Sequence, residues 1–254
     1  MTENNYHKMK LRQITSSGNS REFHEILKKR NNLLKKDYGC NGIIISAPHH
    51  SPKGLENIAG GTRPADNNTG YVARNIADHC KGQLVIATRA TEDPNKTEGT
   101  FHKHTVGKSP NVYVEIHGHV SANYDIEISC GAQSHTKHSE KLAEKVTQYL
   151  NDIATNVEMS KPEMAEQLRN LTVCGNYEDI KMKANRTKTI TDARNAGSNA
   201  YHIELSSELR MKDVGTNESI PEIGVYVSRA ISAALADVHG ECIKSKSPKL
   251  EEPL

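Results

Sequence analysis

Short apolar runs that end in turn-forming residues recur along the chain, and they predict buried strands. The run Gly42–Pro48 is continuous and closes on a proline, which is typical of a strand buried on both faces of a parallel sheet. Three later runs, Leu84–Thr88, Asn111–Ile116 and Ala200–Leu205, have the same character, and a shorter one covers Asp125–Ser129. The chain therefore contains the strands of one sheet.

Segments with the apolar spacing of amphipathic helices alternate with these strands. The spacing and the capping residues predict helices over Ser20–Lys36, Thr69–Cys80, Ser139–Ile153 and Pro221–Val238, and a further helix that opens at Pro162. This alternation predicts an α/β fold with one open, mixed, mostly parallel sheet and helices on both faces, in three layers.

The chain's length and continuity indicate one domain. We expect an α/β domain over residues 20–242, a flexible N-terminal arm over residues 1–19, and a disordered tail over residues 243–254 that is rich in Lys, Ser, Pro and Glu. The polar N-terminus and the lack of a long apolar run predict a cytoplasmic protein that does not enter a membrane.

Charge and cysteine content exclude several classes of function. The 33 basic and 31 acidic residues are interleaved, so we expect no one-sided basic surface for nucleic acid. Five cysteines are scattered without a CxxC pair, which argues against a disulfide framework and against a cysteine-based zinc site. The 13 histidines are numerous for this length, and several occur in close pairs. Metal chemistry is therefore the candidate to test.

Polar side chains follow the predicted strands at the edge where a parallel sheet binds its ligands. His49 ends the first strand, His117 ends the third, and Asp66 lies in the loop after the first. Two imidazoles and one carboxylate make a catalytic zinc site, because three protein ligands leave one position open. Glu204, between two apolar residues of a late strand, is suited to be the general base.

Four short motifs strengthen this prediction by resemblance. They are Ser46-Ala47-Pro48-His49, Asp66-Asn67-Asn68-Thr69, Glu115-Ile116-His117-Gly118 and Ile203-Glu204-Leu205. Together they resemble N-formylglutamate amidohydrolases and phage poly-γ-glutamate hydrolases, which share the fold of the zinc carboxypeptidases. The resemblance implies that His49, Asp66 and His117 hold Zn²⁺ and that Glu204 is the base. The compact His-x-x-Glu motif of carboxypeptidases is absent, which disfavours a carboxypeptidase proper.

Several assignments stay open at this point. His50 competes with His49, and Glu56 competes with Asp66 as the carboxylate ligand. His119 competes with His117, and if it is not a ligand we expect it to bind substrate. Arg89 and Arg194 are predicted to bind a substrate carboxylate through paired hydrogen bonds from the guanidinium.

The sequence thus predicts a zinc-dependent amidohydrolase. Its expected substrate is a small molecule or short peptide, either an N-acyl-amino acid such as N-formylglutamate or a γ-glutamyl compound. The alternative is a non-catalytic module of the same fold that keeps the metal and binds a small carboxylate. Oligomeric state is not predicted.

Overall fold

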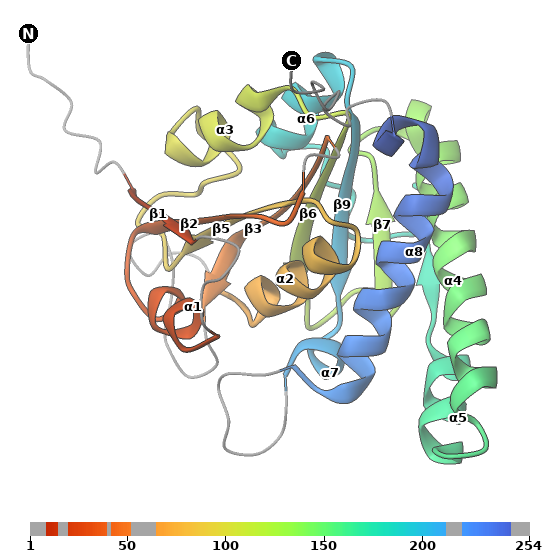
Figure 1. Cartoon of the computed structure of the whole chain (residues 1–254). Helices are drawn as coiled ribbons and strands as arrows, with labels where there is room; N and C mark the ends of the chain where they lie inside the picture. The colour runs from red at the N-terminus through yellow and green to blue at the C-terminus, as the bar shows by residue number, and fades with distance from the viewer. Residues whose placement is uncertain (1–8, 15–19, 40–41, 52–64, 212–219, 245–254) are drawn as a thin grey trace, which may run out of the picture.

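A computed structural model describes residues 9–14, 20–39, 42–51, 65–211 and 220–244 (Figure 1). The strands are β1 Lys10–Ile14, β2 Asn32–Asp37, β3 Ile43–Ser51, β4 Asp66–Asn67, β5 Gln83–Thr88, β6 Val112–Gly118, β7 Ile126–Ser129, β8 Val173–Cys174 and β9 Asn199–Leu205. The α-helices are α1 Ser20–Leu27, α2 Thr69–His79, α3 Thr100–His104, α4 Thr136–Val157, α5 Pro162–Asn170, α6 Lys188–Asn195, α7 Ser207–Arg210 and α8 Glu222–Lys244.

The described strands form one mixed sheet in the order β1-β2-β5-β3-β6-β9-β7-β8, with β4 paired to β3. The four central strands β5, β3, β6 and β9 are parallel to one another. Antiparallel pairs flank them, with β2 against β5 and β7 against β9. The carboxyl ends of the four central strands therefore meet at one edge, where ligands bind in open α/β sheets.

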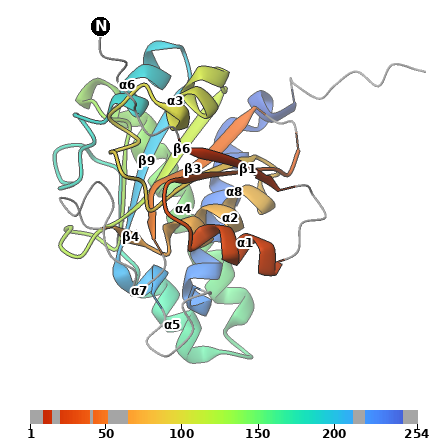
Figure 2. The same cartoon turned by 90° about the vertical axis from the view of Figure 1, so that its left-hand side faces the viewer.

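Helices cover both faces of the sheet, as Figures 1 and 2 show. On one face, α1, α2, α4 and α8 pack their apolar side chains against Ile45, Val114 and Ile203 in the larger core. On the other face, α3 and α6 contribute Phe101 and Ile190 to a smaller core. The predicted three-layer α/β fold is thus confirmed.

The helix predicted over Ser20–Lys36 is wrong in its second half. The helix α1 ends at Leu27, and Asn32–Asp37 form the strand β2. Leu33 and Leu34 are both fully buried, one in each of the two cores, as alternating residues of a strand between two neighbours should be. Pairing with β1 and β5 overrides the helical propensity of leucine and lysine.

Part of the predicted N-terminal arm belongs to the sheet, because Lys10–Ile14 pair with β2 as β1. Residues 1–8 and 15–19 of that arm and residues 245–254 of the predicted tail lie outside the described residues. The other predicted helices and strands are confirmed, and their ends agree within six residues, the largest difference being that α8 continues beyond Val238 to Lys244. In the described part of the chain, no helix combines the length and apolar character needed to cross a membrane.

Candidate metal centre

An irregularity in β3 sets the direction in which the side chain of His49 points. The pairing of β3 with β5 runs regularly to Ala47 opposite Ile86, then resumes with His50 opposite Thr88, so β3 carries one extra residue there. Such a bulge changes which face the following side chains point to. His49 therefore points to the face of α3 and α6, whereas His50 packs against α2 on the opposite face.

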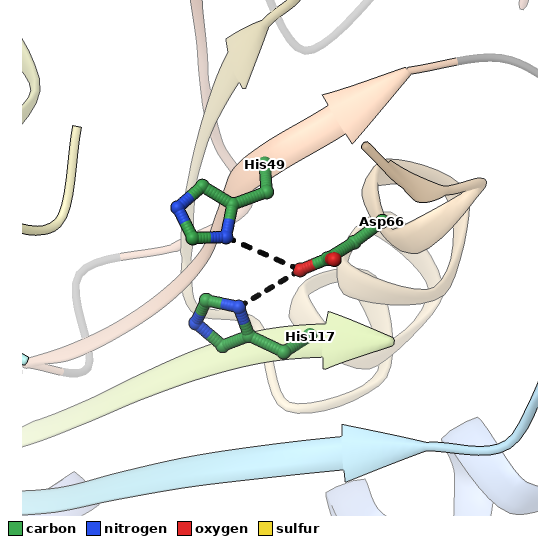
Figure 3. Close-up of side chains that lie close together, drawn as sticks. All are labelled: His49, Asp66 and His117. Carbon is green, nitrogen blue, oxygen red and sulfur yellow. Dashed lines mark hydrogen bonds and ion pairs between the residues drawn. The ribbon is translucent and has the colours of Figure 1, made fainter. Parts of the chain in front are cut away.

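His49 and His117 converge on one carboxylate oxygen (Figure 3). The Nδ1 atoms of His49 and His117 lie 3.3 and 2.9 Å from Oδ2 of Asp66. The two rings are 4.9 Å apart, and both histidines are almost completely buried. Three residues from β3, β4 and β6 thus bring their donor atoms within 4.8 Å of one another.

The outer nitrogen of each ring is held by a second carboxylate. Nε2 of His49 lies 2.8 Å from Oδ1 of Asp93, in the loop after β5. Nε2 of His117 lies 3.2 Å from Oε2 of Glu115, two residues earlier in β6. Metal-ligating histidines characteristically have their second nitrogen fixed in this way, which sets the ring's orientation and leaves the inner nitrogen for the metal.

Burial and hydrogen bonding oppose each other in the titration of this cluster. Burial alone would raise the pKa of Asp66, but hydrogen bonds with His117 and His49 outweigh it and hold the pKa below its usual range. Burial alone would lower the pKa of His117, but hydrogen bonds with Asp66 and Glu115 outweigh it and raise the pKa to about 10. These opposite shifts of pKa favour a positively charged imidazole next to a negatively charged carboxylate in this cluster.

The donor set fits a divalent metal ion. Four carboxylates surround the two imidazoles, and they belong to Asp66, Asp93, Glu115 and Glu204. Glu115 is completely buried, whereas Asp66 and Asp93 are partly exposed. An ionised carboxylate in such a buried cluster is stabilised by a cationic partner. Two nitrogen atoms and one carboxylate oxygen are the ligands of a catalytic zinc site.

Glu204 lies beside this cluster, in register with His117 across β6 and β9. It is 8% exposed, and its Oε2 atom has no hydrogen-bond partner among the described residues. Its Oε1 atom lies 3.6 Å from Nε2 of His202. Burial raises the pKa of Glu204 to about 7. A carboxylate with that pKa can both accept and donate a proton near neutrality.

Sequence reasoning missed Glu115, His202 and Asp93. Glu115 is held by hydroxyl groups, since Tyr113 donates to Oε1 at 2.7 Å and Thr189 donates to the same atom. His202 stacks on His117 with ring centroids 4.1 Å apart. A signal existed for Glu115 and His202, because each stands two positions before a predicted site residue in a strand and therefore shares its face.

The rings of His50 and His119 lie outside the cluster of His49, Asp66 and His117. Nδ1 of His50 accepts a hydrogen bond from the Gly70 amide, so this ring is fixed on α2, and burial lowers its pKa to about 3. Nδ1 of His119 accepts from the Ala122 amide, so His119 lies in the loop beyond β6 rather than in the cluster. Glu56, the alternative to Asp66, lies outside the described residues.

The two arginines predicted to bind substrate do not reach the cluster. Nη1 of Arg89 donates to the Lys28 carbonyl, beside α1. Nη1 of Arg194 donates to the Cys130 carbonyl. Arg194 also lines a pocket with Asn199, at the amino end of β9, whereas the cluster lies at the carboxyl end.

A second group of potential ligands overlaps the first. Glu115, His117 and His202 also bring donor atoms within 4.8 Å of one another. The two groups share His117, and Glu115 already accepts hydrogen bonds from Tyr113 and Thr189. In the first group, by contrast, both histidines turn a nitrogen towards the same oxygen of Asp66.

No family model and no curated protein matches the chain. Among solved structures, a gene product from Agrobacterium tumefaciens is 15% identical, with a TM-score of 0.46 over 90% of this chain and 100% of its own. An N-acetylmuramoyl-L-alanine amidase from Clostridium difficile 630 is 13% identical, with a TM-score of 0.38 over 81% and 98%.

A metallo-carboxypeptidase from Burkholderia cenocepacia is 10% identical, with a TM-score of 0.42 over 87% of this chain and 68% of its own. These similarities are distant. The functional interpretation therefore rests on the geometry of the cluster.

Proposed function

We propose that the protein is a zinc-dependent amidohydrolase, with His49, Asp66 and His117 as metal ligands and Glu204 as general base. The supporting observation is that the inner nitrogens of both histidines face one oxygen of Asp66 while Asp93 and Glu115 hold their outer nitrogens. That arrangement fixes the rings before any metal arrives, which favours tight binding.

Each residue then has a distinct task. A bound zinc ion would polarise the scissile carbonyl and acidify the attacking water. Glu204 accepts the proton of that water and delivers it to the nitrogen of the leaving amine, so one carboxylate serves as base and then as acid. Asp93 and Glu115 keep the two imidazoles oriented throughout.

The proposed substrate class is an N-acyl-amino acid or a γ-glutamyl compound. It rests on the resemblance of the four motifs that carry His49, Asp66, His117 and Glu204 to enzymes of that kind. Arg89 and Arg194 are not used in this proposal, because their hydrogen bonds lie away from the cluster.

Metal analysis and a substrate screen test the proposal together. Protein purified without chelator is expected to carry about one zinc ion per chain and to hydrolyse N-acyl-amino acids or γ-glutamyl peptides. A chelator should remove both the metal and the activity, and added zinc should restore them. Hydrolysis that persists after complete removal of the metal would overturn the proposal. Bound zinc without turnover of any amide would favour the binding module instead.

A further inference from the structure

Arg210, at the end of α7, is a buried arginine with an unusual set of partners. It is 2% exposed, and its guanidinium donates three hydrogen bonds, all to backbone carbonyl groups. Nε donates to Leu205 at 3.1 Å, Nη1 to Asn67 at 2.5 Å and Nη2 to His119 at 3.2 Å. Among the carboxylates of the described residues, none forms an ion pair with it.

The three carbonyl groups belong to the three segments that build the site. Asn67 directly follows Asp66, and Leu205 directly follows Glu204. His119 comes two residues after His117. One side chain is therefore bonded next to the acidic ligand, next to the general base and close behind a histidine ligand.

The residues around Arg210 leave space for its guanidinium. A Cβ atom on Gly118 would lie 2.2 Å from Cζ of Arg210, so only glycine lets the guanidinium lie against the end of β6. In return, Nδ2 of Asn68 donates to the Arg210 carbonyl at 3.1 Å. The segment after β4 and the end of α7 thus hold each other from both sides.

We propose that Arg210 is a positioning residue that sets the spacing of Asp66, His117 and Glu204 by holding the backbone that follows each of them. This role is stated for the zinc site of the proposed function and rests on it. The guanidinium suits the task because it offers five N–H groups in a rigid plane, whereas a lysine ammonium is a single point on a flexible stem.

The matched test is Arg210→Lys, which keeps the positive charge and removes the planar three-point contact. We expect zinc to bind at least ~10-fold more weakly, the range seen when groups that orient metal ligands are removed. The absorption spectrum of the Co²⁺-loaded protein should change, because the ligands relax from their positions. Loss of kcat should exceed the change in KM.

Two further variants separate positioning from general stability. Gly118→Ala should reproduce the weaker metal binding while keeping Arg210, since the added methyl group displaces the guanidinium. Tyr201→Phe is the control, because it removes a buried hydrogen bond to His239 on the opposite face of β9. It should lower stability and leave the Co²⁺ spectrum unchanged.

Amide hydrogen exchange on metal-free protein gives a readout that does not depend on zinc. Arg210→Lys should speed exchange in the peptides around Asn67, His119 and Leu205 together, and Tyr201→Phe should not. A folded Arg210→Lys protein with wild-type exchange in these peptides and an unchanged Co²⁺ spectrum would overturn the positioning role. A wild-type protein that binds no metal would overturn the proposed function, and the exchange result alone would then decide the role of Arg210.

Discussion

His117 and Glu204 are register partners in the parallel pair of β6 and β9, so their side chains leave the sheet on the same face and at the same height. Neither strand alone brings the proposed metal ligand next to the proposed base. The pairing does, and it fixes their separation through the backbone rather than through flexible side chains. The chemistry of both groups is therefore tied to one local feature of the sheet.

Replacing His117 with alanine should abolish zinc binding and leave the fold intact. One of three ligands is lost, which should collapse affinity, while the core on the other face is untouched. Zinc content and circular dichroism together measure the outcome. His119→Ala is the matched control and should retain zinc, because its ring is bonded to Ala122 outside the cluster. Wild-type zinc content in folded His117→Ala would refute the ligand assignment.

Glu204→Gln should retain zinc and lose at least ~10²-fold in kcat, because the amide keeps the shape and removes the basicity. Turnover of an N-acyl-amino acid and the metal content should be measured on the same preparation. If the Gln variant loses its zinc, Glu204 is a ligand and not the base.

The pH profile of the wild-type enzyme should show the titration of Glu204. Burial raises its pKa from 4.5 to about 7, and a bound dication would lower it again. A general base works when deprotonated, so kcat/KM should rise with pH, with its limb between ~4.5 and ~7. If the residual activity of Glu204→Gln still rises over the same pH range, the titrating group is not Glu204.

Zinc uptake should release protons, and the apparent affinity should weaken as the pH falls. Hydrogen bonds that His117 donates to Asp66 and Glu115 raise its pKa to about 10, so at neutral pH we expect this ring to carry a proton that the metal must displace. The apparent Kd should rise about tenfold per pH unit for each proton released. Calorimetry in buffers of different ionisation enthalpy counts these protons. A pH-independent affinity would contradict the prediction.

His239, far from the metal cluster, should make stability depend on pH. Burial lowers its pKa to about 4, with His138 and Lys141 of α4 acting in the same direction. The unfolded chain binds the proton first, so this contribution to stability is lost as pH falls from ~6.5 towards ~4.

His239→Gln removes the titration. The fall in unfolding free energy between about pH 7 and pH 4.5 should therefore be smaller than in wild type, by an amount of order 1 kcal/mol after allowance for solvent screening. Denaturant unfolding at the two pH values measures this difference. An equal fall in both proteins would contradict the prediction.

The strand-end histidines could be predicted because an apolar run followed by His49 or His117 identifies both the strand and its carboxyl end. Asp93 could not be predicted, since it comes from a loop whose path depends on tertiary packing. The helix extended wrongly to Lys36 shows the same limit, because Leu33 and Leu34 are strand residues only through their neighbours. The sequence offered many arginines, and only the fold singles out Arg210.

The extra residue in β3 determines which of the two adjacent histidines, His49 or His50, faces the cluster. In an uninterrupted strand, side chains alternate, so His50 would share the face of Ser46 and His49 would point towards α2. The bulge between Ala47 and His50 reverses that order. A chain of this kind that lost one residue at Pro48 would return to regular alternation and still present its first histidine to the cluster, whereas a chain that kept that residue but lost the bulge would present the second. Alignments of such proteins should therefore match residues that point to the same face of the sheet, and not residues at the same distance in sequence from the start of the strand.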